Sequence, residues 1–401
     1  MAFNDVIVVQ QSGGLGRRVA ATDGVSGLLF NAVAVVGGFQ LNKAYRLTAL
    51  ADLDALLIDE TYDTTNKVLV YENIKDFFLS NPSTGEVWIY GVDNTLTYAQ
   101  MVTQKTEPLV LGSGGAVKLV GYSYNDKLTG IPATPVDLDA VIAAAQSVTT
   151  TLRTNHYPLS ALVEMVGLTV AVATSTNYHN KNARNVTAVA GQNYAIAQDN
   201  DTKYRCAIGR ALGTASLAAV HENIGWLQKF NQIGGNLMKA AVGGTEISQL
   251  SLSQLTTMND NGLVFLKDFA DDPQAGLYWN DSFTCTTLTD DFAYLENNRT
   301  IDKATRLIRR AFLPYLNSPI YVDPNTGQLA PNVVAMLEQV GNKTITDEML
   351  TAGEISGFTF TIEPAQDILA TSQLEAVLTI TPVGTARKII IKIGFNNPFN
   401  S

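Results

Sequence analysis

Few residues in this chain of 401 have the types and spacing that enzymes use. A glycine-rich run, Gly112-Ser-Gly-Gly115, follows an apolar stretch, as a phosphate-binding loop does. The Gly-Lys-Ser/Thr that completes such a loop is missing, and there is no Gly-x-Gly-x-x-Gly with an acidic partner after the next strand. We therefore expect an ordinary loop or bulge here, and keep an α/β nucleotide-binding enzyme as a remote alternative.

The histidines and cysteines also lack a reactive arrangement. His156, His179 and His221 do not have the spacing of metal ligands. Cys206 and Cys285 lie far apart, without a neighbouring base, and we expect both to be small buried fillers. No serine stands in a Gly-x-Ser-x-Gly turn. The sequence thus predicts no catalytic residue, no cofactor and no metal, and we expect a protein that is not an enzyme.

Composition limits the classes of partner. The chain is 46% hydrophobic, only 16% charged, and has a net charge of −10. This charge argues against binding to nucleic acid or to an anionic membrane. The longest apolar run, 161–173, contains Glu164 and is too short to span a bilayer, and the N-terminus lacks the cationic region of a secretory signal. A chain of this length can bury a sizeable core, and we expect two domains.

The elements that would position any site form two patterns. Before residue 263, short apolar strands alternate with helices, which predicts a mixed α/β layer fold. The expected strands are 29–36, 67–71, 86–91, 116–122, 162–172 and 185–191, and the expected helices are 73–81, 137–156 and 206–222. From 263 onward the pattern is α+β, with helices at 299–316 and 328–342 and a hairpin of strands at 374–382 and 387–395.

Both ends of the chain carry an apolar strand close to the terminus. Val6, Ile7, Val8 and Val9 form one short apolar strand, followed by a glycine-rich segment. In the strand near the C-terminus, Ile389, Ile391, Ile393 and Phe395 alternate on one face. Because single strands are not stable alone, each must dock into a sheet of its own subunit or of another one.

One helix has a basic side opposite an apolar side. Arg299, Lys303, Arg306 and Arg310 fall within about a 60° arc of the helix that begins at 299. Such a side is either solvated or a contact surface for an acidic partner.

In order along the chain, several segments resemble those of contractile tail sheath proteins, which occur in contractile phages and related injection machines. The resemblance covers roughly residues 160–395 and is carried by Ala207-Ile-Gly-Arg-Ala-Leu-Gly-Thr214, His221-Glu-Asn-Ile-Gly-Trp226, Phe265-Leu-Lys-Asp-Phe269, Ala275-Gly-Leu-Tyr-Trp279, Arg299-Thr-Ile-Asp-Lys303 and Ile355-Ser-Gly-Phe-Thr-Phe-Thr-Ile-Glu-Pro364.

This resemblance implies an architecture. It divides the chain into an N-terminal arm (1–24), an outer mixed α/β domain (25–262), an inner α+β C-terminal domain (263–385) and a C-terminal arm (386–401). In the family, both arms exchange strands between subunits, and the helix equivalent to the one at 299 faces the tail tube. The expected tube-facing residues are therefore Arg299, Lys303, Arg306 and Arg310.

The resemblance also implies a function. The chain would be a structural subunit that polymerises as stacked hexameric rings around a tube and contracts to drive the tube through a target cell envelope. Its expected partners are further copies of itself, the tail tube protein, and baseplate and tail terminator proteins, without nucleic acid or membrane insertion. It would belong to a phage virion assembled in the host cytoplasm. The alternative is the sheath of a bacterial injection or type VI-like secretion system, in the bacterial cytoplasm.

Overall fold

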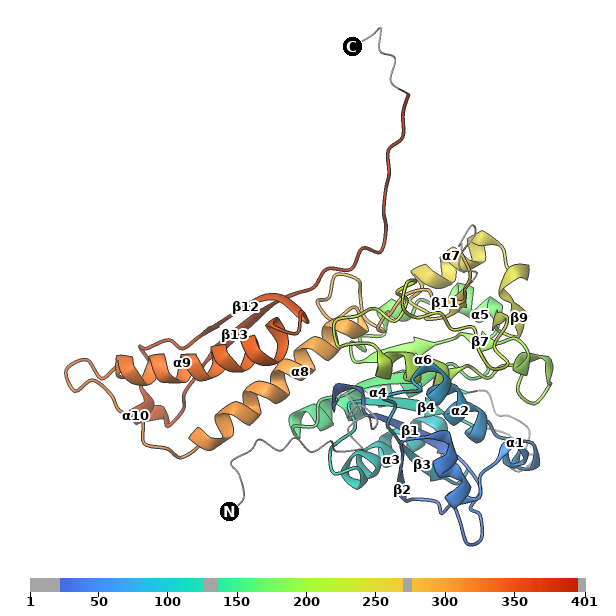
Figure 1. Cartoon of the computed structure of the whole chain (residues 1–401), viewed down its shortest axis with the longest axis horizontal. Helices are drawn as coiled ribbons and strands as arrows, with labels where there is room; N and C mark the ends of the chain where they lie inside the picture. Colours follow the sequence, from blue (N-terminus) through green and yellow to red (C-terminus); the bar gives the residue numbers. More distant parts are fainter. Residues whose placement is uncertain (1–21, 126–135, 270–275, 396–401) are drawn as a thin grey trace, which may run out of the picture. The chain divides into compact units, whose positions relative to one another are not determined.

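A computed structural model describes residues 22–125, 136–269 and 276–395 (Figure 1). The chain forms two compact units, residues 1–309 (unit 1) and 310–401 (unit 2). This division does not coincide with the boundary expected near residue 263. Residues that follow 263 pack against the main sheet of unit 1, where Val264 donates its N–H to Ala188 and accepts from Ala190. The expected strand Val6–Val9 lies outside the described residues.

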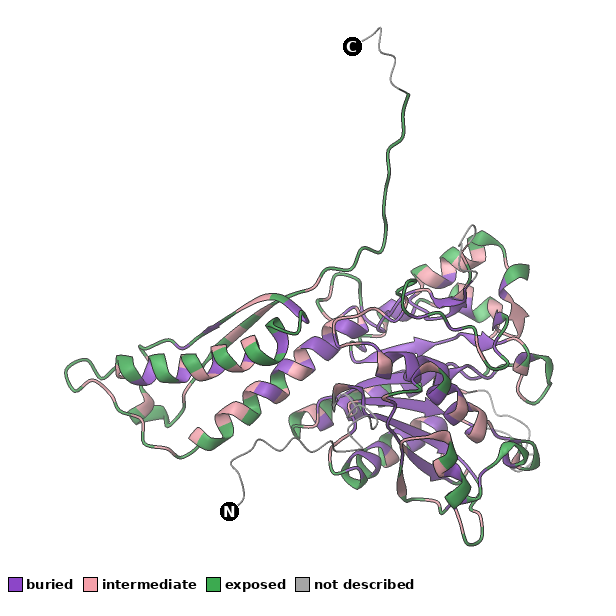
Figure 2. Ribbon diagram, in the orientation of Figure 1, coloured by how far each residue is buried: buried purple, intermediate pink, exposed green. Residues whose placement is uncertain are grey.

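Unit 1 is built on a six-stranded mixed sheet. Its strand order is β2-β3-β1-β4-β5-β6, with β2 antiparallel to β3 and all other neighbours parallel. The strands are β1 (Ser26–Asn31), β2 (Ala44–Leu47), β3 (Val87–Val92), β4 (Leu119–Ser123), β5 (Ser160–Glu164) and β6 (Val186–Val189). The inner strands are buried on both faces, as parallel sheets between helices are (Figure 2).

Helices cover both faces of this sheet. A Cβ at Gly27 would meet Leu109 of α3, whereas a Cβ at Gly121 would meet Ile208 and Leu212 of α6. Helices α3 and α4 therefore lie on one face, and α2 and α6 on the other. The helices of unit 1 are α1 (Glu60–Asn66), α2 (Val70–Ser80), α3 (Tyr98–Gly112), α4 (Leu138–Thr154), α5 (Val170–Ser175), α6 (Ile208–Leu217) and α7 (Leu252–Asp260).

Smaller elements complete unit 1. They are the three-stranded sheet of β7 (Gln192–Asn193), β8 (Ala240–Val242) and β9 (Thr245–Glu246), the pair β10 (Leu266–Lys267) and β11 (Tyr278–Trp279), and the 3-10 turn η1 (Thr22–Gly24). Helix α8 (Leu295–Phe312) begins in unit 1, and its last residues are grouped with unit 2.

Unit 2 contains a helix packed on a two-stranded sheet. Helix α9 (Pro331–Ile345) continues into a π-helical turn (Thr346–Leu350) and packs against β12 (Ile355–Thr361). Strand β12 pairs antiparallel with β13 (Val377–Pro382), and the short helix α10 (Ile368–Thr371) lies between them in sequence. Phe358 and Phe360 pair with Ile380 and Leu378 on the face toward α9, while the threonines of both strands are exposed.

Three expected strands differ from the structure. Residues 67–71 lead into α2, because the carboxylate of Asp63 accepts the N–H groups of Val70, Tyr71 and Glu72 and so caps that helix. The run 162–172 divides into β5 and the start of α5, whose N-terminus is capped by Thr169. The hairpin expected between 374–382 and 387–395 is absent, since β13 pairs with β12 instead and residues 383–395 have no regular structure.

Candidate assembly surface and candidate reactive groups

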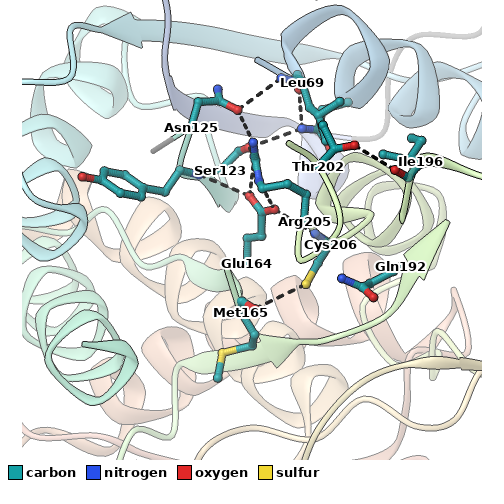
Figure 3. Close-up of polar contacts among 12 residues, drawn as sticks. Leu69, Ser123, Asn125, Glu164, Met165, Gln192, Ile196, Thr202, Arg205 and Cys206 are labelled. Atoms are coloured by element: carbon teal, nitrogen blue, oxygen red, sulfur yellow. Dashed lines mark hydrogen bonds and ion pairs between the residues drawn. The ribbon is translucent and has the colours of Figure 1, made fainter. Parts of the chain in front are cut away.

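The carboxyl ends of the parallel strands, where α/β folds usually bind ligands, are filled by a buried ion pair (Figure 3). Glu164 ends β5 and is fully buried; its carboxylate accepts from Nε and Nη2 of Arg205 at 2.7 and 2.9 Å. Arg205 also donates to Ser123, which ends β4, and to Asn125. Asn125 in turn donates to the carbonyl of Asn31 at the end of β1.

This cluster holds the segment before α6 on the strand ends. The Glu164 carboxylate also accepts the backbone N–H of Cys206 at 2.8 Å, and burial raises the pKa of the Cys206 thiol well above its usual value. A thiol kept protonated in this way is a poor nucleophile. Because the carboxylate and the guanidinium engage each other and neighbouring polar groups, the geometry supports a structural role rather than substrate binding.

The glycine-rich loop at 112–115 lies at the wrong end of a helix for phosphate. Gly112 is the last residue of α3, and the loop leads into β4, whereas phosphate loops lead from a strand into a helix N-terminus. A helix C-terminus presents carbonyl groups; here Val110 and Leu111 accept the N–H groups of Gly115 and Gly114. The interpretation as an ordinary loop thus agrees with the geometry.

Among the described residues, neither the histidines nor clustered acids form a metal centre. The buried His179 has its Nδ1 2.9 Å from the carbonyl of Thr286, and its ring packs edge-on against Phe283. Over the three described ranges, no group of three histidine, cysteine, aspartate or glutamate side chains is arranged to hold a metal ion. Within the same ranges, no helix is both long and apolar enough to cross a bilayer.

The basic side of α8 is largely internal, which corrects the expectation of one exposed surface. Arg299 is 5% exposed and donates from Nη2 to Ala218 and from Nη1 to Ala219, at 2.9 and 3.2 Å. These carbonyls follow the C-terminus of α6, where a cation is favourable. Burial lowers the pKa of Arg299 to about 10.

Further along α8, two cations share one carboxylate from the other end of the chain. Asp23 in η1 lies 3.0 Å from Nζ of Lys303 and 2.6 Å from Nη2 of Arg306. Although burial opposes ionisation of Asp23, these two cations lower the pKa of its carboxyl below the ordinary value. Arg310 alone of the four predicted residues is strongly exposed, in a pair with Glu348 at 3.4 Å. The predicted tube contact can therefore apply only to the end of α8, unless this network opens.

The residues predicted for strand exchange at the C-terminal end remain outside any sheet. Ile389, Ile391, Ile393 and Phe395 are 76%, 77%, 93% and 110% exposed. Such a run of exposed apolar residues is unusual on a soluble surface and indicates a contact site. Meanwhile, as far as the described residues go, the sheet of unit 2 has only β12 and β13, so each strand has one unpaired edge. We call residues 383–395 the C-terminal tail.

Comparisons with known proteins agree with this architecture. Family models match nearly all of the chain: DUF2586, N-terminal domain, at residues 3–283, and DUF2586, C-terminal domain, at residues 291–400. No curated protein sequence matches the chain.

Solved structures of similar fold come from contractile injection systems. A chain of the anti-feeding prophage baseplate, solved with six-fold symmetry, and one of the contracted helical sheath of that prophage both align with a TM-score of 0.62, at 14% and 13% identity. Each alignment covers 99% of this chain and 100% of the other. The contracted PVC sheath complex, an extracellular contractile injection system, aligns at 0.59 with 12% identity, covering 99% and 98%. The expected fold, mixed α/β followed by α+β as in contractile sheath proteins, is confirmed.

Proposed function

The chain belongs to the DUF2586 family, and from its fold and its terminal tail we propose that it is a structural subunit of a contractile sheath. In this proposal the subunits assemble as stacked hexameric rings around a tail tube and contract to drive the tube through a cell envelope. The role requires no catalysis, which agrees with the filled strand ends of unit 1.

The proposal rests on one observation: among the described residues, unit 2 has both a two-stranded sheet with unpaired edges and a strand-like tail that belongs to no sheet. Two-stranded sheets are marginally stable and gain from further strands. The C-terminal tail has the alternation of such a strand, with an apolar face of Ile389, Ile391, Ile393 and Phe395 that matches the apolar inner face of β12 and β13. We propose that the tail of one subunit adds to the unpaired edge of β12 or β13 in another.

Simple magnitudes indicate that this link would be strong. About five backbone hydrogen bonds at roughly 0.5–1.5 kcal/mol each stabilise it by several kcal/mol. Each of the apolar side chains named above adds about 1.5–3 kcal/mol when fully buried. Such a link would hold neighbouring subunits together while rigid units rotate during contraction.

Charge favours the same arrangement. The tail carries Arg387, Lys388 and Lys392 and no acidic residue, whereas residues 310–382 carry eight acidic and two basic side chains. Glu363 and Glu375 are exposed; Glu363 lies just after the end of β12, and Glu375 lies just before the start of β13. Attraction between these groups would favour docking of the tail, and it would weaken with added salt.

The remaining parts of the proposal concern partners and place. The N-terminal segment, with Val6–Val9, would supply a second exchanged strand, and the exposed end of α8 at Arg310 would contact the tube. Baseplate and tail terminator proteins would close the two ends of the sheath. The machine would be a phage tail in the virion or, as the alternative, a bacterial injection or secretion system in the cytoplasm.

A matched pair of tail variants tests the proposal. Ile391→Asp places a charge on the face that would be buried, whereas Ile390→Asp places it on the face shared with Lys388 and Lys392. By negative-stain electron microscopy, with and without the candidate tube protein, we expect sleeves or ring stacks from the wild type and from Ile390→Asp. Ile391→Asp should give folded single particles. Uniform small particles from the wild type under both conditions would overturn the sheath function.

A further inference from the structure

Helix α8, η1 and the residue before β4 line a small, partly open cavity with an excess of positive charge. Its volume is about 10 Å³. It is lined by Asp23, Lys118, Val220, Arg299, Asp302 and Arg306. All of these residues belong to unit 1, and the site lies at the amino ends of β1 and β4, away from the buried ion pair of Glu164.

Both carboxylates that line the cavity are already engaged by cations. Asp23 bridges Lys303 and Arg306, and the carboxylate of Asp302 lies 2.6 Å from Nη1 of Arg153. Lys118 and Arg299 bind carbonyl oxygens instead: Lys118 Nζ donates to Gly115 at 2.5 Å, and Arg299 donates to the end of α6. Around this cavity, among the described residues, five cations face two carboxylates, and the carboxylates of Glu222 and Glu296 also act on Arg299. A smaller excess of positive charge remains.

A buried excess of one charge is unfavourable unless something compensates it. The effect is visible at Lys118, whose pKa falls to about 8 through burial and through repulsion by Arg306, while Asp23 and Asp302 act in the opposite direction. Since Arg299 is 5% exposed, water screens its charge poorly.

We propose that this cavity binds one small monovalent anion of the halide class, held by Lys118, Arg299 and Arg306. A volume of about 10 Å³ matches a single atom-sized occupant. The bound anion stabilises unit 1 and fixes η1, the first described turn of the chain, against α8. This site does not depend on the proposed sheath function.

The first test locates the anion. Crystals of the full chain are soaked in sodium bromide, and anomalous scattering is measured at the bromine edge. We expect a peak inside the cavity, within contact distance of Lys118 and Arg306. A map with bromide only at other places, or none, would overturn the proposal.

The second test measures stabilisation by thermal unfolding in sodium chloride and in sodium gluconate at equal ionic strength. We expect a saturable rise in Tm with chloride, of about 1–2 °C at five times the Kd, that gluconate does not reproduce. Lys118→Gln should abolish this rise. Lys105→Gln, which removes the same charge from an exposed site, should retain it. A bromide peak without any chloride-specific rise means an adventitious ion only, and refutes a stabilising site. If Lys118→Gln does not fold, the wild-type measurements decide.

The anion should also respond to pH. Because the bound anion favours protonated Lys118, whose pKa lies at about 8, binding weakens as the pH rises through that value. The chloride-specific rise in Tm should thus be larger at pH 6.5 than at pH 9. An equal rise at both values would exclude Lys118 as a ligand.

Discussion

Two arginines of helix α8 offer a direct test of the packing described for its basic side. Arg299→Met removes a buried guanidinium and leaves the carbonyl of Ala218 without its donor, whereas the carbonyl of Ala219 still accepts the N–H of Glu222. Arg310→Met changes the same residue type on the same helix, where the side chain is 70% exposed. Methionine keeps a similar length and a good helix propensity, so both variants leave the helix itself intact.

The expected energies differ clearly. An unsatisfied buried acceptor costs about 1–3 kcal/mol, and relief from burying the Arg299 charge offsets part of the sum. We expect Arg299→Met to lower the free energy of unfolding of unit 1 by about 1–3 kcal/mol. The exposed pair of Arg310 with Glu348 contributes at most about 1 kcal/mol, so Arg310→Met should be nearly neutral.

Tryptophan fluorescence during urea unfolding is a suitable assay. Trp88, Trp226 and Trp279 are the only three tryptophans of the chain, and all lie in unit 1. The urea concentration at the unfolding midpoint should fall for Arg299→Met and remain unchanged for Arg310→Met. If Arg299→Met leaves the midpoint unchanged, or if both variants lower it equally, the assignment of Arg299 to the interior is wrong.

Three further substitutions test other parts of the structure. Gly341→Ala in α9 would place a Cβ 2.4 Å from the ring of Phe360. We expect it to lower the stability of unit 2 by about 1–3 kcal/mol, measured as faster hydrogen exchange in α9 and β12. Unchanged exchange would contradict this close packing. Glu164→Gln leaves the buried Arg205 without its counter-charge and should cost about 3–5 kcal/mol by urea unfolding, and an effect below 1 kcal/mol would show that the pair is not buried. Asp23→Asn should destabilise unit 1 at neutral pH. Because the folded-state pKa of Asp23 is lowered, its contribution is present above the unfolded pKa of about 3.9 and disappears as the pH falls through the folded value; a difference from wild type that persists at lower pH would refute the ion pairing.

Local patterns predicted most helices and buried strands, because burial and periodicity coincide there. The helix expected at 137–156 is α4 (Leu138–Thr154), and the strand expected at 185–191 contains β6. The apolar run at 67–71 predicts a strand, but the structure has the start of α2 there, because Asp63, which lies outside the run, caps that helix. Propensity is overridden where a cap or a tertiary contact supplies the hydrogen bonds.

Contacts between distant residues could not be predicted from the sequence. The basic spacing on α8 gave no indication that Arg306 pairs with Asp23, 283 positions away. Asp302, within the same basic stretch, was the available signal, because a carboxylate there favours a network over a uniformly solvated side. Likewise, the sequence pattern pairs β13 with the strand expected at 387–395, its nearest neighbour in sequence, whereas in the structure β13 pairs with β12.

This difference in pairing bears directly on assembly. A tail paired with β13 of its own subunit would leave no strand to exchange, whereas the observed pairing leaves residues 387–395 exposed. In the proposed assembly, the exposed strand-like tail and the sheet with unpaired edges would form the two halves of one interface.

The most direct test of the account is a cryo-electron microscopy map of the assembled protein in which residues 387–395 can be traced. The account predicts that this segment forms a strand on β12 or β13 of another subunit, with Ile389, Ile391 and Ile393 turned toward α9 of that subunit. A tail that pairs with the sheet of its own subunit, or that lies unpaired on the assembled surface, would contradict it.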